Sequence, residues 1–147
     1  MKSKLDYPTV NVKAADGVKP DGTPYNIMVV EDQEFTRKMI VQILESEGYK
    51  IVAQAANGKA ALDMLKKLDN KVDLITTDLD MPEMDGYALL YEIVEQKLPV
   101  KVVFISEDTT KGVIADLLKM GARDFILKPP QRGKILERIK LAFGKTK

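Results

Sequence analysis

Polar residues of three chemical kinds follow four short apolar runs in this chain. Glu31 and Asp32 follow one run, Asp78 another, Ser106 a third and Lys128 a fourth. If these runs are parallel strands of one sheet, their ends place three carboxylates, a hydroxyl and an ammonium at a single edge. This set of groups can hold a divalent cation together with a phosphoryl group.

The three carboxylates imply a cation, because acidic groups brought together repel one another unless a positive charge lies among them. Oxygen ligands with room for water fit Mg²⁺ best, and Mn²⁺ should substitute. Lys128 would supply a fixed positive charge and Ser106 a hydrogen-bond donor, both suited to phosphoryl oxygens. A carboxylate in this setting can act as a nucleophile toward a phosphoryl group. We therefore predict Asp78, expected between the ion and Lys128, as the nucleophile.

The composition excludes several other chemistries. The 147 residues include no cysteine and no histidine, which removes thiol chemistry, imidazole catalysis and the usual zinc ligands. Lysine plus arginine (23) nearly balances aspartate plus glutamate (22), so binding to nucleic acid or to an anionic membrane is not expected. No apolar stretch approaches the length of a membrane span, and the N-terminus lacks a secretory signal. We expect a soluble cytoplasmic protein.

The elements that must position these groups alternate regularly along the chain. Continuous apolar runs are typical of strands covered by helices on both faces, and helices are indicated by apolar residues on one face, such as Phe35, Ile40 and Leu44. Strict β/α alternation predicts an α/β fold with a parallel sheet and right-handed crossovers. The fold that we expect is a doubly wound, flavodoxin-like sheet of five strands in the order 2-1-3-4-5. Strands are predicted at 27–30, 49–55, 73–77, 101–105 and 124–127, and helices at 35–46, 59–68, 86–96, 111–120 and 134–143.

In such a sheet, ligands bind outside the carboxyl ends of the strands, where the winding reverses between the first and third strands. Glu31, Asp32 and Asp78 end those two strands. Adjacent strands are about 4.8 Å apart, so Ser106 and Lys128 fall within side-chain reach. All five groups can therefore touch one ligand.

The first 24 residues differ from the rest, since they carry several turn signals and few large apolar residues. We expect residues 1–24 to be a mobile N-terminal extension and residues 25–147 to form one domain. The stretch 9–13 alternates polar with apolar residues and could add an edge strand or dock on a partner.

From Asn26 to Phe143 the chain resembles the receiver domain of bacterial two-component response regulators, and most closely the single-domain, CheY-like chemotaxis type. Five landmarks occur in order at family-like spacing. They are the acid pair in VVED, the segment DLDMPEMDG that begins at Asp78, the FIS that ends at Ser106, and two residues of GARDFILKP, Phe125 and Lys128.

The resemblance implies a chemistry for these residues. Asp78 would accept a phosphoryl group from a partner histidine kinase, with Ser106 and Lys128 assisting. Mg²⁺ would be bound by Asp32, Asp78 and the backbone carbonyl of Asp80, and Glu31 would act largely through water. The chain would then be a phosphoacceptor signalling protein rather than an enzyme, with self-catalysed phosphotransfer and slow autodephosphorylation.

The resemblance also implies a switch. Ser106 would move toward the phosphate and Phe125 would follow it inward, which would reshape the surface of the fourth helix, fifth strand and fifth helix. That surface would bind a downstream partner such as a flagellar-switch component, and a phosphatase would be a further partner of a monomeric protein. Glu107 stands where the family favours a small residue, so Glu107 and Asp108 are expected to modulate access to the site.

Two alternatives stay open. A pseudo-receiver would be an interaction module with an inert pocket, and Glu107 lends it some support. A Mg²⁺-dependent phosphohydrolase of the haloacid dehalogenase type would use Asp78 and Asp80 as an Asp-x-Asp pair. That family places the pair after the first strand, whereas here it follows the third.

Overall fold

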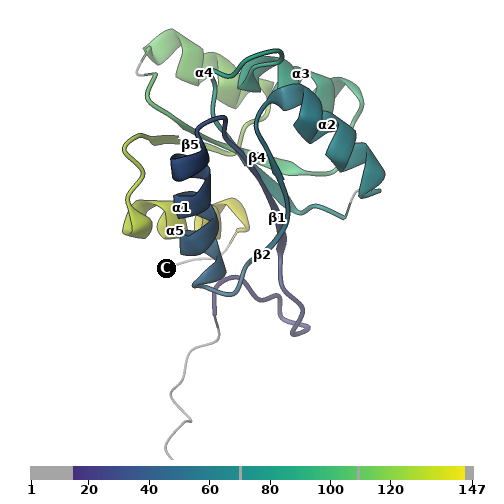
Figure 1. The fold of residues 1–147 in the computed structure, drawn as a ribbon, viewed down its shortest axis with the longest axis vertical. Helices are drawn as coiled ribbons and strands as arrows, with labels where there is room; N and C mark the ends of the chain where they lie inside the picture. The colour runs from purple at the N-terminus through teal and green to yellow at the C-terminus, as the bar shows by residue number, and fades with distance from the viewer. Residues whose placement is uncertain (1–14, 70, 109, 145–147) are drawn as a thin grey trace, which may run out of the picture.

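Five parallel strands form the sheet in the computed structural model, which describes residues 15–69, 71–108 and 110–144. The strand order is β2-β1-β3-β4-β5, so the predicted doubly wound sheet is confirmed. Figure 1 shows β1 near the middle of the sheet, with helices on both sides. The strands are β1 (Asn26–Val30), β2 (Lys50–Ala55), β3 (Leu74–Thr77), β4 (Lys101–Ser106) and β5 (Asp124–Leu127).

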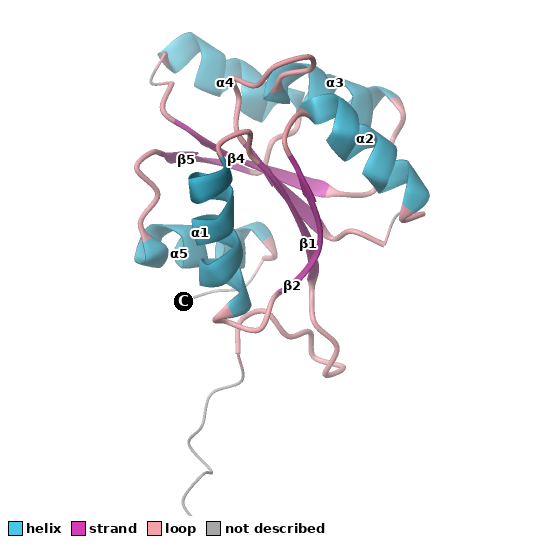
Figure 2. Cartoon of the chain, viewed as in Figure 1, coloured by secondary structure: helices cyan, strands magenta, loops and turns pink. Residues whose placement is uncertain are grey.

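Helices cover both faces of this sheet, as Figure 2 shows. Alternate strand residues point to opposite faces, and they divide the core into two clusters. Met28 and Val30 pack with α2, α3 and α4, whereas Ile27 and Val29 pack with α1 and α5. Burial on both faces explains why the strands appear in the sequence as unbroken apolar runs. The helices are α1 (Glu34–Glu45), α2 (Gly58–Lys67), α3 (Gly86–Glu95), α4 (Lys111–Met120) and α5 (Arg132–Ala142).

Phe35 is the exception to the predicted helix pattern. It was expected on the buried face of the first helix, but its side chain is 82% exposed. Ile40 and Leu44 supply the buried stripe of α1. At 3.6 residues per turn, Phe35 lies about 140° around the helix axis from Ile40, which is outside that stripe. None of the described helices is both long and apolar enough to cross a membrane.

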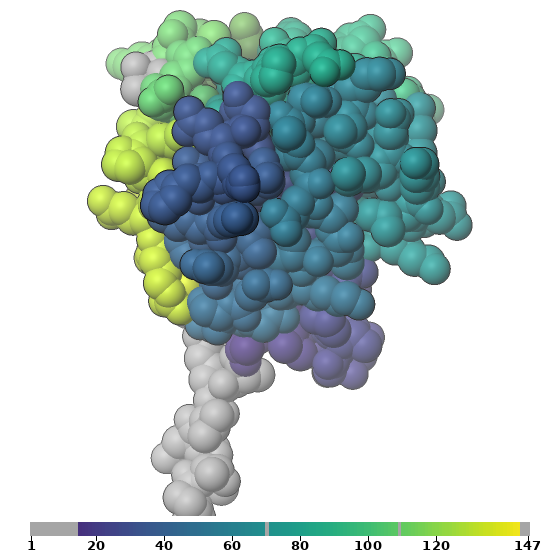
Figure 3. All heavy atoms as spheres, in the orientation of Figure 1, coloured from purple at the N-terminus to yellow at the C-terminus, as the bar shows by residue number. Residues whose placement is uncertain are grey.

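Residues 15–24, the described part of the predicted N-terminal extension, contact the rest of the chain. The mobility and the domain boundary predicted for residues 1–24 stay predictions. Gly17 N–H donates to the Glu47 carbonyl at 2.8 Å, and Tyr25 N–H donates to the Gly17 carbonyl at 2.8 Å. Val18 and Pro24 form an antiparallel bridge. Figure 3 shows this segment, in purple, against the end of the domain. Residues 1–14, including the stretch 9–13, lie outside the described residues.

The close approach of Gly17 to the turn after α1 gives a testable expectation. A Cβ at Gly17 would lie 2.2 Å from Tyr49 N and 2.5 Å from the Gly48 carbonyl carbon, both backbone atoms. Gly17→Ala should therefore lower the free energy of unfolding by about 1–3 kcal/mol, measured by urea denaturation. Gly133→Ala is the matched control, because a Cβ there meets nothing within 4 Å. If both variants unfold at the midpoint of the parent chain, the segment is not held against the domain in solution.

Candidate functional site

Three carboxylates meet at the carboxyl ends of β1 and β3. Glu31, Asp32 and Asp78 each place one carboxylate oxygen within 4.8 Å of the others. The two strands are paired in register, with Val30 opposite Thr77, so the residues that follow them are brought side by side. Glu31 and Asp78 are buried, whereas Asp32 is exposed. The structure thus combines a buried acidic pair with a solvent-facing third carboxylate.

Lys128 is the positive group of this cluster. Its Nζ lies 2.8 Å from Glu31 Oε1 and 2.9 Å from Asp78 Oδ2. Burial alone would lower the pKa of Lys128, but its contacts with Glu31 and Asp78 outweigh burial, so the pKa lies above its ordinary value. Lys128 therefore carries its charge throughout the physiological pH range.

Glu31 is the most deeply buried of the acids. Burial raises its pKa and the charge of Asp78 adds to that effect, while contacts with Lys128 and the backbone N–H of Gln33 act in the opposite direction. Oε2 accepts from Gln33 N–H at 3.1 Å. Oε1 is paired in charge with Lys128, but the pair is not aligned as a hydrogen bond, and Oε1 accepts none within the described part of the chain. The charge of this oxygen is therefore balanced by the Lys128 ammonium.

These residues fit Mg²⁺. Three carboxylates against one ammonium leave an excess of negative charge, and every donor atom is an oxygen, as Mg²⁺ prefers. One buried oxygen of Glu31 accepts no hydrogen bond. Asp78 Oδ1 is held by the N–H of Leu79 at 2.7 Å, which fixes the orientation of the carboxylate. The cluster is therefore suited to a hydrated divalent cation.

Ser106 and the loop after it border the cluster. Ser106 ends β4 and is fully buried. Lys128 N–H donates to the Ser106 carbonyl at 2.9 Å, which ties the end of β5 to the end of β4. The hydroxyl of Ser106 accepts from Asp108 N–H at 3.4 Å. Glu107 is exposed and Asp108 half-buried, so both lie on the solvent side of Ser106.

Asp80 has an exposed side chain outside the group of three carboxylates. Its pKa is raised by partial burial and then by the charges of Asp78, Asp108, Asp85 and Glu107. The loop after β3 therefore faces the loop after β4 across a strongly negative space. The expected ligand of Asp80 is its backbone carbonyl, and that role stays a prediction.

Phe125 lies on β5, half-buried, with its ring stacked on Phe104 at a centroid distance of 6.3 Å. This places Phe125 beside the core, and its movement as a switch stays a prediction. The Lys128–Pro129 peptide bond is cis.

Two supporting residues have no clear signal in the sequence. Arg37, in the first turns of α1, donates from its guanidinium to the Glu31 carbonyl at 2.9 Å and so holds the end of β1. Gly86 begins α3 so close to β3 that a Cβ there would lie 2.2 Å from the Asp78 carbonyl oxygen. An arginine six residues after an acid and a glycine after an aspartate are each too common to predict such contacts.

Comparisons with known proteins match this arrangement. The family model of the response regulator receiver domain matches residues 27–140. The chemotaxis protein CheY of Treponema pallidum is 42% identical over 139 residues, which cover 95% of this chain and 96% of that protein. CheY of Bacillus subtilis is 37% identical over 115 residues, which cover 78% of this chain and 94% of that protein. Both are similar over nearly their whole length.

A solved structure is similar as well. A chain of the CheX–CheY–BeF3–Mg²⁺ complex from Borrelia burgdorferi superimposes with a TM-score of 0.86 and 36% identity, covering 89% of this chain and 98% of that chain. The response regulator domain of Thermotoga maritima CheB superimposes with a TM-score of 0.74 and 29% identity, covering 84% of this chain and 98% of that chain.

Proposed function

Since this chain belongs to the response regulator receiver family and is closely related to CheY chemotaxis proteins, we propose that Asp78 accepts a phosphoryl group from a partner histidine kinase. The observation that carries the proposal is the placement of the Asp78 carboxylate. It lies at the end of β3, within 4.8 Å of two further acids and 2.9 Å from Lys128 Nζ. The pseudo-receiver and phosphohydrolase alternatives receive no support from the relatives.

The chain's own residues suit phosphoryl transfer. One Asp78 carboxylate oxygen would form a bond to phosphorus while the bond from phosphorus to the kinase imidazole breaks, and the imidazole would keep that electron pair. Lys128 would balance negative charge on the phosphoryl oxygens, and the Ser106 hydroxyl would donate to one of them. Mg²⁺, or Mn²⁺ in its place, would supply charge neutralisation when held by Asp32, Asp78 and the Asp80 carbonyl, with Glu31 acting through water.

The effector surface proposed on α4, β5 and α5 carries exposed apolar side chains. Leu118 and Leu127 are 45% and 50% exposed, and Leu141 on α5 is also exposed. Leu117 is the fully buried residue of α4, so this helix has few core contacts to break when it shifts. A downstream switch component, or a protein like the CheX of the Borrelia complex, would bind here to a monomer of this chain.

Incorporation of phosphate from acetyl phosphate tests the proposal. We expect incorporation that requires Mg²⁺, is stoichiometric, and is reversed by hydroxylamine or base, because an acyl phosphate is labile to both. A chain that stays unmodified would be a pseudo-receiver. Continuous rapid hydrolysis of a generic phosphate ester would indicate a phosphohydrolase instead, and a modification that survives hydroxylamine would not lie on a carboxylate.

Glu107 should slow phosphorylation by small anionic donors. It is exposed beside the negative space around Asp80, and its charge adds to the rise in the pKa of Asp80. Glu107→Gln should speed phosphorylation by acetyl phosphate about 2- to 5-fold at low salt, and added salt should shrink this gain. Glu107→Ala should add a salt-independent gain if bulk also narrows the approach. Equal rates for all three proteins at low salt would show that Glu107 points away from the approach to Asp78.

A further inference from the structure

The outer face of α3 presents an apolar stripe to solvent. Tyr87, Tyr91 and Val94 recur at i, i+4 and i+7, and they are 44%, 50% and 47% exposed. The opposite face of α3 is buried through Leu89 and Ile93. Neither tyrosine ring forms an aromatic contact or a hydrogen bond within the described residues. The stripe is not needed to fill the core, so it is available to another molecule.

The charges that the chain itself places on α3 and just before it are all negative. Residues 72–96 contain no lysine or arginine. Glu83 lies just before α3 and Glu95 is its last residue, four positions after Tyr91. Both are exposed, and neither forms an ion pair with another described residue. The stripe therefore combines two aromatic rings with unpaired carboxylates at both ends.

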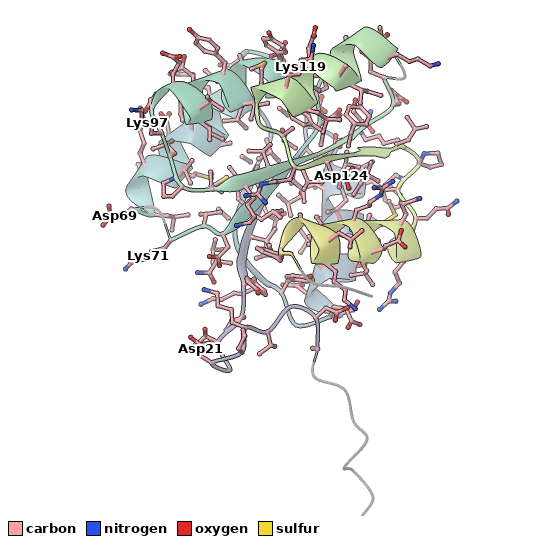
Figure 4. All side chains as sticks on the ribbon, turned by 180° about the vertical axis from the view of Figure 1, so that it is seen from behind. Asp21, Asp69, Lys71, Lys97, Lys119 and Asp124 are labelled. Atoms are coloured by element: carbon pink, nitrogen blue, oxygen red, sulfur yellow. The ribbon has the colours of Figure 1, made fainter. Side chains whose placement is uncertain are left out.

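The lysines nearest to this surface lie outside α3. In the rear view of Figure 4, Lys97 follows the end of α3 and Lys119 lies on the neighbouring helix α4. Gly121, the residue that ends α4, lies near Val94 on the third turn of α3. An aromatic surface with carboxylates on its rim attracts cations through both the ring quadrupole and the charges.

A second copy of this chain does not fit the stripe. Three half-exposed side chains offer roughly 300 Å² of apolar contact, whereas a stable protein–protein interface buries about 800 Å² on each partner. Two copies would also set acidic rims against each other, which costs affinity. A short segment with complementary charge can bind to a surface of this size.

From these observations we propose that the outer face of α3 docks an arginine- or lysine-bearing segment of another protein. The cationic side chains lie over the rings of Tyr87 and Tyr91 and pair with Glu83 and Glu95, and an apolar neighbour packs on Val94. This surface is separate from the one on α4, β5 and α5. Binding here does not require a phosphoryl group on Asp78.

The probe for this surface is a short capped peptide of arginine and leucine, titrated into ¹⁵N-labelled full-length protein. Saturating Mg²⁺ is present throughout, so that the acidic cluster around Asp78 is already occupied. We expect amide shifts to concentrate on α3. A Tyr87→Ala/Tyr91→Ala variant should bind about 5- to 25-fold more weakly, since each exposed cation–π contact corresponds to about 2- to 5-fold. The matching Phe/Phe variant should stay within about 2-fold of the parent chain.

Matched variants distinguish binding through the tyrosine rings and the two glutamates from non-specific binding to exposed apolar or charged side chains. Phe35→Ala removes an exposed apolar side chain from α1, and Glu45→Gln removes an exposed charge from the same helix, so both should leave the affinity unchanged. Glu83→Gln/Glu95→Gln should weaken binding, and the loss should shrink at high salt. The proposal is overturned if the shifts lie only around Asp78, if the tyrosine-to-alanine variant binds like the parent, or if a glutamate–leucine peptide binds equally well.

Discussion

Replacing Asp78 with asparagine should reduce phosphorylation by acetyl phosphate to background while the domain stays folded. An amide oxygen is not a nucleophile toward phosphorus at neutral pH, and no other carboxylate in the cluster has the same two contacts. Asp78 alone combines a 2.9 Å contact with Lys128 and a bond from the next backbone N–H. Glu31 touches Lys128 but is fully buried, and Asp32 forms no ion pair with a described residue.

The same change should not lower the free energy of unfolding. Asparagine has the size of aspartate and removes one of three mutually repelling charges, so the urea midpoint without Mg²⁺ should stay equal or rise. Mg²⁺ should stabilise the variant less than the parent, because one ligand is weakened. Asp63→Asn, an exposed position on α2, is the control and should be phosphorylated like the parent. Full incorporation into Asp78→Asn would assign the phosphoacceptor to another residue.

Lys128→Met should produce the largest loss of stability. Glu31 is 1% exposed, and Lys128 lies 2.8 Å from it. Removing one partner of a buried ion pair leaves an uncompensated charge, which typically costs about 3–5 kcal/mol. Urea denaturation at pH 7.5 with a chelator present should show this loss. Lys119→Met, on the exposed side of α4, should stay within about 0.5 kcal/mol of the parent.

The pH dependence of the unfolding free energy tests whether the buried charge of Glu31 causes the loss of stability in Lys128→Met. Burial raises the pKa of Glu31 above its ordinary 4.5, and losing Lys128 removes a contact that opposes this rise. A raised pKa in the folded state means that the folded protein binds the proton more tightly than the unfolded chain. The loss of stability caused by burying the charged Glu31 carboxylate is therefore complete above the folded-state pKa of Glu31. It disappears as the pH falls toward 4.5, because the carboxylate becomes protonated. Lys128→Met should approach the parent in stability as the pH is lowered through this window.

Mg²⁺ should also restore part of the stability of Lys128→Met, because a cation bound by the cluster replaces the missing charge. If the deficit is the same at every pH and with or without Mg²⁺, its origin is lost packing of the lysine stem rather than the charge of Glu31.

The meeting of the acids and Lys128 could be predicted because the carboxyl ends of parallel strands lie at one edge of the sheet. A strand that is covered on both faces must be apolar throughout, so the first polar residue marks its end. Asp78 and Lys128 are 50 residues apart, yet their side chains meet at 2.9 Å because each follows the end of its strand. The same rule brought Ser106 beside them. The periodicity of the helices placed most boundaries within two residues of those observed.

The sequence by itself determined the alternation of strands and helices, the edge at which the acids meet, and the oxygen-ligand chemistry that follows from having neither cysteine nor histidine. Only the tertiary structure decided which contacts lie between elements. In the folded chain, residues 15–24 contact the domain through Gly17, the side chain of Phe35 is exposed, and Arg37 donates to the carbonyl of Glu31. Patterns along the chain record burial within one element, whereas these contacts depend on how two elements approach each other in space.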